Sequence, residues 1–237
     1  MSDIGVVWIR EDFRIENNAA LSYATQNHNH VIALYIYNNI DFDNKREAQK
    51  WWLSKSLEIF KNDLLNYKVN LQILKGDELN IFSKLRKKDK ISIYWNKIYE
   101  PDVIAKGKKI RDIFLKNEIS FKYFKGNILN EFQDVTKNDG TPFKVFTPFW
   151  RNAEQKYINS TPSKDYKIKK CISSKLFFKN CIDPKEILPK KNWFKKFENY
   201  WEVSENKSKK ILKELLENKI KDYGTSRDIP SIEGTSK

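Results

Sequence analysis

Cysteine, histidine, glycine and proline are all scarce in this sequence. Only two cysteines and two histidines occur among 237 residues, too few for a disulfide framework, and no metal site follows from them. Cys171 and Cys181 are interpreted as reduced thiols of a cytoplasmic protein, because no other feature indicates secretion. His28 and His30 are interpreted as solvated residues of a turn. We therefore expect no metal site.

Two further absences narrow the possible functions. The N-terminus has no basic stretch followed by a long apolar one, and no apolar run approaches the length that spans a bilayer. We therefore expect no membrane partner. The sequence also contains neither G-x-G-x-x-G after the first apolar run nor G-x-x-x-x-G-K-[ST]. Neither a dinucleotide-binding fingerprint nor a Walker phosphate loop can be assigned.

The chain is rich in apolar, aromatic and basic residues. Apolar residues make up 40% and aromatic residues 14%, a composition typical of a folded protein and not of a disordered one. Lysine and arginine total 45 against 31 acidic residues, which gives a net charge of +14. That excess favours a polyanionic partner such as nucleic acid. Lysine supplies most of it, however, and a compositionally biased genome produces the same excess without any functional demand.

The first 125 residues alternate short apolar runs with segments of helical periodicity. The first two runs are almost continuously apolar, which indicates strands buried on both faces of a parallel sheet. This alternation predicts an α/β fold, a doubly wound parallel five-stranded sheet whose ligands collect at the carboxyl ends of the strands. We expect strands at 4–9, 31–37, 71–74, 91–95 and 119–124, and helices at 17–27, 47–67, 79–88 and 101–117.

A different pattern begins after Gly126. Thr147 and Pro148 predict the N-cap and the first residue of a short helix that ends near Tyr157. Residues 159–200 are lysine-rich, are interrupted by prolines and show no clear periodicity. They are expected to form an ordered but irregular connector.

The last predicted element is an amphipathic helix over residues 204–223. Its apolar residues recur at three- and four-residue steps, and Gly224 is expected to end it. A single helix of this kind cannot bury its apolar face alone. It needs partners that the rest of this chain does not supply.

The turn after the first strand is rich in charge. In WIREDFRIENNAAL, Arg10 and Arg14 stand on either side of Asp12. In a parallel sheet this turn lies at the carboxyl edge, where ligands of α/β proteins bind.

The same stretch resembles the opening of the DNA photolyase and cryptochrome family, which reads W-F-R-x-D-L-R followed by D-N-x-A-L. Asn17 is a departure, because the family usually has Asp there. Four later segments resemble the family in the correct order: WWLSKSLEIF, NKIYEP, FKVFTPFW at 143–150, and the stretch from Asn192 to Ser236. The residues that match in the opening are Trp8, Arg10, Asp12, Arg14, Asn18, Ala20 and Leu21.

The resemblance implies the N-terminal portion of a photolyase. Residues 1–130 would form its α/β antenna-binding domain, 131–203 an interdomain connector, and 204–237 the truncated start of an all-helical FAD-binding domain. The implied function is deoxyribodipyrimidine photolyase, a light-driven, FAD-dependent lyase that repairs cyclobutane pyrimidine dimers in DNA. Its partners would be UV-damaged DNA and the missing C-terminal FAD domain. This fragment alone is expected to be inactive.

The resemblance also implies roles for individual residues. Tyr223, Thr235 and Ser236 match positions that contact FAD, and Lys237 stands where the family more often has Arg. Arg227 matches a position that contacts a DNA phosphate near the lesion. No catalytic residue and no tryptophan of the family's electron-transfer chain falls within this stretch.

The antenna pigment cannot be assigned. Folate-binding relatives place Asn and Glu shortly after the N-x-x-Y-E motif, where this sequence has Asp102 and Val103. Because valine cannot accept the hydrogen bonds of a pterin, a folate antenna is not supported. A deazaflavin, a flavin or no antenna stay open.

Other interpretations remain. Tyr223 could simply close a helix end, and Arg227 could pair with Asp228 or Asp222. Trp8, Trp51 and Trp95 are expected in the core. At the level of function, the alternatives are a cryptochrome-like blue-light photosensor and a stand-alone basic nucleotide- or DNA-binding module without flavin.

Overall fold

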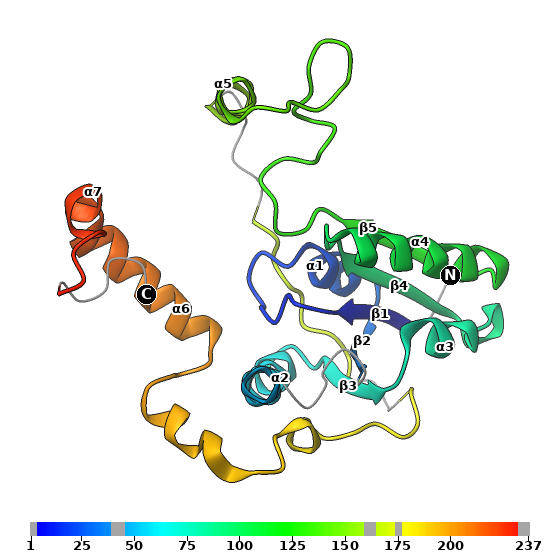
Figure 1. The fold of residues 1–237 in the computed structure, drawn as a ribbon. Coiled ribbons are helices and arrows are strands. Elements are labelled where there is room, and N and C mark those ends of the chain that lie inside the picture. Colours follow the sequence, from blue (N-terminus) through cyan, green and yellow to red (C-terminus); the bar gives the residue numbers. More distant parts are fainter. Residues whose placement is uncertain (1–3, 39–45, 159–164, 174–176, 232–237) are drawn as a thin grey trace. The chain divides into compact units, whose positions relative to one another are not determined.

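The computed structural model describes residues 4–38, 46–158, 165–173 and 177–231. The chain forms two compact units, coloured along the sequence in Figure 1. Residues 1–39 and 64–182 form the first, here called the sheet unit. Residues 40–63 and 183–237 form the second, here called the helical unit.

The sheet unit contains five parallel strands in the order β3-β2-β1-β4-β5. The strands are β1 (Ile4–Ile9), β2 (His30–Tyr37), β3 (Asn70–Lys75), β4 (Ile91–Asn96) and β5 (Ser120–Phe124). The chain runs outward from β1 to β3 and then returns to add β4 and β5 on the other side of β1. This order confirms the predicted doubly wound α/β fold, and it places the topological switch point between β1 and β4.

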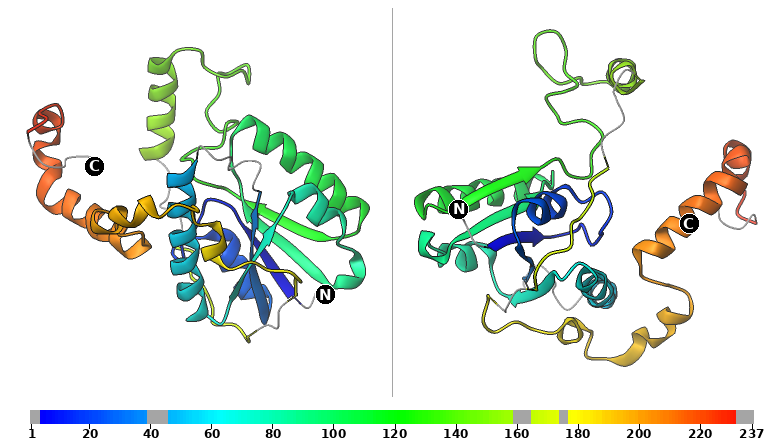
Figure 2. Two further views of the ribbon diagram at one scale, coloured as in Figure 1. Left: turned by 60° about the horizontal axis from the view of Figure 1, so that its bottom comes forward. Right: turned by 180° about the vertical axis from the view of Figure 1, so that it is seen from behind.

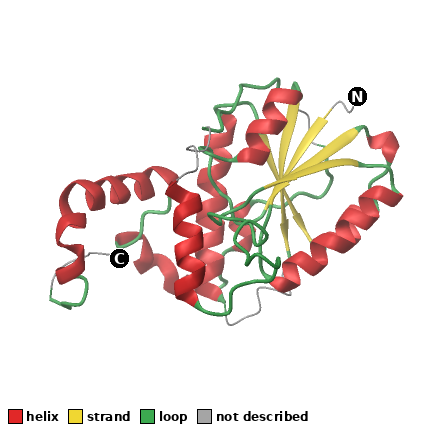
Figure 3. Ribbon diagram, turned by 90° about the horizontal axis from the view of Figure 1, so that it is seen from above, coloured by secondary structure: helices red, strands yellow, loops and turns green. Residues whose placement is uncertain are grey.

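Helices cover both faces of this sheet, as Figure 3 shows. The sheet unit has α1 (Ala19–Asn27), α3 (Glu78–Ser83), α4 (Pro101–Lys116) and α5 (Phe146–Ile158). Phe82 of α3 and Phe114 of α4 are buried against Val6 and Trp8 of β1. Gly5, whose side chain would point to the opposite face, lies instead against His28 at the end of α1.

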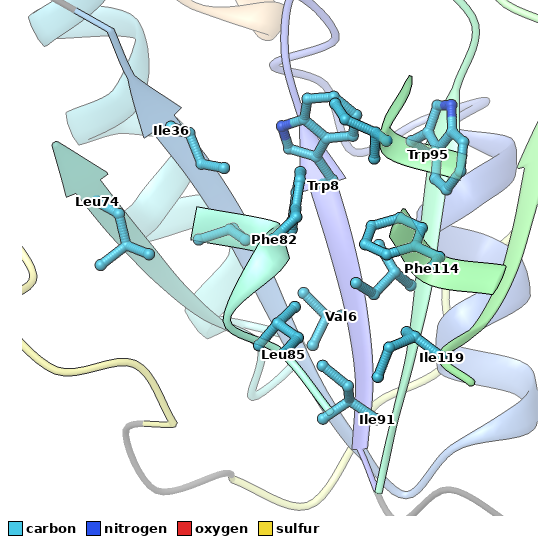
Figure 4. Packing of buried hydrophobic residues seen from close by; sticks show 13 residues of the cluster. Val6, Trp8, Ile36, Leu74, Phe82, Leu85, Ile91, Trp95, Phe114 and Ile119 are labelled. Carbon is cyan, nitrogen blue, oxygen red and sulfur yellow. The ribbon is translucent and has the colours of Figure 1, made fainter. Parts of the chain in front are cut away.

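Four aromatic rings pack among the aliphatic side chains in the core of the sheet unit (Figure 4). The ring of Trp8 packs edge to face against Phe82, with 5.0 Å between the ring centroids, and against Trp95, with 5.9 Å between the centroids. Phe82 in turn contacts Phe114 at 5.1 Å. Such contacts add to the stabilisation that burial of these large rings already provides. The expected core positions of Trp8 and Trp95 are confirmed, since each is buried.

The helical unit has its own smaller core. Trp51 lies on α2 (Glu47–Leu65), is 2% exposed, and packs with Phe194 and Val203. The Ser54 hydroxyl donates to the Pro184 carbonyl at 2.8 Å, and Lys55 pairs with Glu198 at 2.8 Å. Residues far apart in the sequence thus join α2 to the segment after residue 183. The position of Trp51 in a core is confirmed.

The described part of the connector is irregular but closely hydrogen-bonded to the sheet unit. The Ser22 hydroxyl donates to the Lys167 carbonyl at 2.7 Å, and the Cys171 N–H donates to the Tyr67 carbonyl at 2.9 Å. Farther along, the Ile182 N–H donates to the Ile73 carbonyl at 2.8 Å, beside the edge strand β3. Cys171 and Cys181 are free thiols. The connector therefore covers backbone that an open edge strand would expose.

The interpretation of His28 as a solvated turn residue is wrong. His28 is the C-cap of α1, and its Nε2 lies 2.7 Å from the Tyr94 hydroxyl. Its ring occupies the space beside Gly5, where an added Cβ would lie 2.8 Å from the His28 Cδ2. The His28 ring fits here because Gly5 has no side chain and because Tyr94, 66 residues away, supplies a hydrogen-bond partner. The sequence around His28 indicates neither contact.

Three expected helix ends also differ from the structure. Helix α5 begins at Phe146, so Thr147 lies inside its first turn and is not the N-cap. Helix α3 ends at Ser83, and residues 87–89 form a separate 3₁₀ turn. Gly224 does not end a helix, because it lies within α7 (Tyr223–Ser226). Short 3₁₀ or π turns follow α3 and α6 (Glu205–Glu214). Residue propensity does not distinguish these turns from an α-helix, so the ends of the α-helices cannot be predicted exactly.

Candidate functional site

The carboxyl ends of β1 and β4 meet at the switch point of the sheet. Arg10 directly follows β1, and Asn96 is the last residue of β4. The turn that carries Arg10, Asp12 and Arg14 lies here, as the sequence predicts. Ligands of doubly wound sheets bind in the crevice at this edge.

Asn96 is the centre of a hydrogen-bond network at this edge. Its Oδ1 accepts from the Ala20 N–H at 3.1 Å, in the first turn of α1. Its Nδ2 donates to Asp12 Oδ2 at 2.6 Å and to Asn18 Oδ1 at 2.9 Å. Asn18 is the N-cap of α1, and its Oδ1 also accepts from the Leu21 N–H at 3.1 Å. The network therefore fixes the β1–α1 turn to the end of β4.

The guanidinium of Arg10 is mostly engaged in contacts within the sheet unit. Its guanidinium lies 4.7 Å from the centroid of the Trp8 ring, and it donates to the backbone carbonyl of Asn96. Burial lowers the pKa of Arg10 to about 10, with the nearby Asp12 carboxylate acting in the opposite direction, so the group stays a cation at neutral pH. Arg14, by contrast, is exposed. The charge-rich turn therefore divides into a structural part, Arg10 and Asp12, and an accessible part, Arg14.

A second polar cluster lies where β4 and β5 end. The Tyr99 hydroxyl accepts from the Gly126 N–H at 3.1 Å and donates to Glu131 Oε1 at 2.9 Å. The same carboxylate pairs with Lys97 Nζ at 2.9 Å. Burial raises the pKa of Tyr99, so its hydroxyl remains a donor at neutral pH. Sequence reasoning missed Glu131, because it lies in an irregular segment with no periodic signal.

The two positions considered for a folate antenna lie beside this cluster in the sequence. Pro101 begins α4, as predicted. Asp102 is exposed and Val103 is half-buried in the first turn of the helix. An exposed carboxylate and an apolar side chain do not reproduce the paired amide and carboxylate of the folate-binding pattern.

The residues expected at the cofactor site lie in the helical unit, as far as the structure describes them. Tyr223 begins α7 and is 37% exposed. Arg227 is the C-cap of α7, and its guanidinium lies 6.0 Å from the centroid of the Tyr223 ring. Thr235, Ser236 and Lys237 lie outside the described residues. The structure thus brings Tyr223 and Arg227 together on one turn.

The surroundings of Tyr223 are open. An added Cβ at Gly224 would have no atom within 4 Å. The Thr225 and Ser226 hydroxyls donate to the Asp222 carbonyl at 3.0 and 2.6 Å, so they brace the turn. Arg227 Nε lies 3.4 Å from Asp228 Oδ2, at the surface. An accessible aromatic ring, a cation and open backbone can together receive an anionic, ring-bearing ligand.

Two negative findings concern only the described ranges. Within residues 4–38, 46–158, 165–173 and 177–231, no three His, Cys, Asp or Glu side chains gather as a metal site would require. Among the same residues, no helix combines the length and the apolar character needed to cross a bilayer.

Comparison with known proteins gives consistent matches. The family model described as DNA photolyase matches residues 5–167. The deoxyribodipyrimidine photo-lyase of Agrobacterium fabrum is 27% identical over 236 residues, which is 98% of this chain and 48% of that protein. Cryptochrome-1 of Arabidopsis thaliana is 25% identical over 186 residues, 74% of this chain and 27% of that protein.

Among solved structures, the bacterial class III photolyase of Agrobacterium tumefaciens superimposes with a TM-score of 0.82 at 26% identity. The match covers 98% of this chain and 48% of that one. The chain therefore spans about half the length of the curated photolyases it matches.

Proposed function

The chain belongs to the DNA photolyase family, whose model matches most of its length, and we propose that it forms the N-terminal portion of a deoxyribodipyrimidine photolyase. Such an enzyme repairs cyclobutane pyrimidine dimers in DNA by a light-driven, FAD-dependent reaction. The observation that carries the proposal is the match to photolyases over 98% of the chain in both sequence and structure.

The proposed organisation follows from that relationship. Residues 1–130 serve as the α/β domain that holds any antenna pigment, 131–203 as the connector, and 204–237 as the beginning of the helical FAD domain. The antenna remains unassigned, since Asp102 and Val103 do not favour folate. A cytoplasmic location stays a prediction from the low cysteine content.

The residues near α7 fit one side of a flavin nucleotide. Tyr223 offers an accessible ring, Gly224 leaves the backbone open, and Arg227 supplies a cation on the same turn. Together with Thr235, Ser236 and Lys237, Tyr223 would hold FAD through its ring and phosphates. When bound, FAD supplies the light-excited electron that splits the dimer.

In this proposal, Arg227 binds DNA instead of reacting. A dimer must leave the helical stack before a buried cofactor can reach it, and a poorly stacked lesion is the less costly one to extrude. A guanidinium near that site can hold the adjacent phosphate through two parallel hydrogen bonds. Its ion pair with Asp228 at 3.4 Å is exposed, so it would exchange readily for a phosphate.

The first test is flavin retention. The chain alone is expected to lose FAD on gel filtration, because it carries only part of the site. The joined protein, meaning residues 1–237 followed by the second half of the Agrobacterium fabrum relative, is expected to retain it. Absorbance near the flavin bands after gel filtration measures both. A joined protein that is folded but free of flavin would contradict the proposal.

A second test concerns Arg227. Arg227→Ala in the joined protein is expected to weaken binding of dimer-containing duplex at least roughly tenfold, because the charge-assisted hydrogen bonds of its guanidinium to phosphate are lost. Arg46→Ala, which removes another exposed arginine, is the matched control and should change affinity less than about twofold. Fluorescence anisotropy at fixed salt measures both, because phosphate contacts depend on salt. Equal losses of affinity in the two variants would show that Arg227 contributes only its positive charge and makes no specific phosphate contact.

A cryptochrome-like photosensor is the second candidate. It is favoured by the match to Cryptochrome-1, which covers less of this chain than the match to the photolyase does. We rank it second for that reason.

A further inference from the structure

A dense group of basic side chains lies at the amino edge of the sheet. The turn that joins α3 to β4 reads KLRKKDK over residues 84–90, and α4 ends beside it at Lys116. The carboxyl ends of the strands, with the switch point, lie at the other edge. In the right-hand view of Figure 2, the arrows of β1 and β5 point away from this amino edge.

The turn at 84–90 is held in one shape by its own contacts. Leu85 is 7% exposed and belongs to the core of the sheet unit. The Asp89 carboxylate accepts from the Arg86 N–H at 2.7 Å. The Arg86 guanidinium donates to the Ser83 and Leu85 carbonyls. The basic side chains of this turn therefore stand on a fixed backbone.

The end of α4 is joined to the same turn. The Asn117 amide donates to the Leu85 carbonyl at 2.9 Å, and Lys87 pairs with Glu118 at 2.6 Å. These contacts place Lys116 next to the turn. Six exposed basic residues thus form one surface, here called the amino-edge patch: Lys84, Arg86, Lys87, Lys88, Lys90 and Lys116.

The composition of the chain does not explain the charge of the amino-edge patch. The ten residues 84–90 and 116–118 contain six cations and two carboxylates. Basic residues are therefore about three times as dense here as in the whole chain. A compositional bias towards lysine raises the number of lysines everywhere, but it does not gather them around one turn.

Most of these charges are available to a partner. The side chains of Lys87 and Glu118 are 73% and 65% exposed, and an ion pair as exposed as this one contributes little to stability. Glu118 can therefore be exchanged for another anion. Among the residues that the structure describes, no acidic side chain forms a salt bridge with Lys84, Lys88 or Lys116.

The chemistry of the amino-edge patch fits a phosphate backbone. Clustered lysines bind nucleic acid by displacing its counterions and do not read its sequence. Surfaces that hold single strands usually offer aromatic rings on which the bases stack, and residues 84–90 and 116–118 contain no aromatic residue. Duplex DNA, whose bases are already stacked, suits this surface better than a single strand does.

We propose that the amino-edge patch is a second DNA-binding surface, which holds the phosphate backbone of undamaged duplex. It belongs to the sheet unit, whereas Arg227 belongs to the helical unit. The choice of DNA as the polyanion rests on the proposed function. Contacts to phosphates alone let a protein slide and hop along DNA, so this surface keeps the enzyme on DNA between lesions.

Binding of the chain alone to a short undamaged duplex tests the proposal. The unaltered chain is expected to bind with a Kd between roughly 1 and 100 µM at physiological salt. The patch variant combines Lys84→Gln, Lys88→Gln and Lys116→Gln, and it should bind at least about tenfold more weakly. The slope of log K against log salt should fall by about 2.7, which is 0.9 for each lost phosphate contact. Fluorescence anisotropy over a series of salt concentrations measures both.

A matched control removes the same charge from elsewhere in the sheet unit. The control variant combines Lys75→Gln, Lys137→Gln and Lys144→Gln, three exposed positions at or after the carboxyl ends of β3 and β5. Its affinity should change less than about threefold, since distant charges act only through the general field. Circular dichroism checks that both variants fold. If the patch variant does not fold, Lys88→Glu replaces it and should weaken binding at least about threefold.

The outcomes decide between a DNA-binding surface and general charge. A loss of affinity confined to the patch variant supports the proposal. Equal losses in the two variants would overturn it, and so would duplex binding that does not weaken with salt. Binding to phosphatidylserine vesicles without binding to duplex would overturn it in favour of a membrane surface. The test uses neither flavin nor a lesion, so its failure is distinguishable from a failure of the proposed function, which flavin retention measures.

Discussion

Replacing Asn96 by alanine is expected to destabilise the sheet unit by about 4 kcal/mol, because several buried hydrogen bonds are lost together. Asn96 is 8% exposed and its side-chain amide joins β4 to the β1–α1 turn and to the start of α1. Without it, the Asp12 carboxylate loses its 2.6 Å partner and the Ala20 N–H loses its acceptor. Groups left unsatisfied in this way cost more than a hydrogen bond contributes when it forms.

Urea unfolding followed by circular dichroism measures this loss, provided that the slope with denaturant is unchanged. Asn27→Ala is the matched control, because Asn27 is exposed and makes a single bond to the Tyr23 carbonyl. It should cost less than about 0.5 kcal/mol. An Asn96→Ala protein within about 1 kcal/mol of the unaltered chain would show that the network does not hold the switch point together.

Gly126→Ala is expected to destabilise the same unit by about 3 kcal/mol, the upper range for forcing an atom into packed structure. An added Cβ would lie 1.9 Å from the Lys97 carbonyl oxygen and 2.9 Å from its carbon. Both are backbone atoms at the end of β4, so they cannot rotate away as a flexible side chain would. The clash would also strain the hydrogen bond from the Gly126 N–H to the Tyr99 hydroxyl.

Gly107→Ala provides the control, since it adds the same methyl group to a glycine inside α4 that has no atom within 4 Å. It should stabilise the protein by about 0.5–1 kcal/mol through helix propensity. Thermal unfolding of the two variants should therefore shift in opposite directions. Shifts of the same sign would show that close approach at Gly126 is not the deciding factor.

Local patterns were sufficient to predict the sheet. The five strands lie within one residue of the predicted runs. The first two are buried on both faces, and such strands are nearly continuous in apolar residues. The core positions of Trp8, Trp51 and Trp95 followed from the same reasoning. Burial of large side chains leaves a strong signal in the sequence.

Contacts between distant residues could not be predicted in this way. Asn96 contacts the first turn of α1 across 76 residues, and Gly126 approaches Lys97 from another loop. His28 was misread because its partner, Tyr94, belongs to a different strand. Asparagine, glycine and histidine each occur in many environments, so the residue type alone does not predict these contacts. They are determined by the fold.

The candidate site shows the same division. The resemblance to a family indicated Tyr223 and Arg227, which the structure places on one turn. The π turn at Leu215–Lys219 was not predicted, because apolar residues spaced by three and four also fit an unbroken α-helix.

Light-dependent repair by the joined protein tests most directly the central claim, that this chain is the antenna-side portion of a flavin-dependent DNA repair enzyme. A duplex with one thymine dimer would be incubated with the joined protein, or with the chain alone, under blue light and in darkness. We expect dimer loss only with the joined protein and only in the light. A folded joined protein that binds the duplex but leaves the dimers intact in the light would contradict the claim.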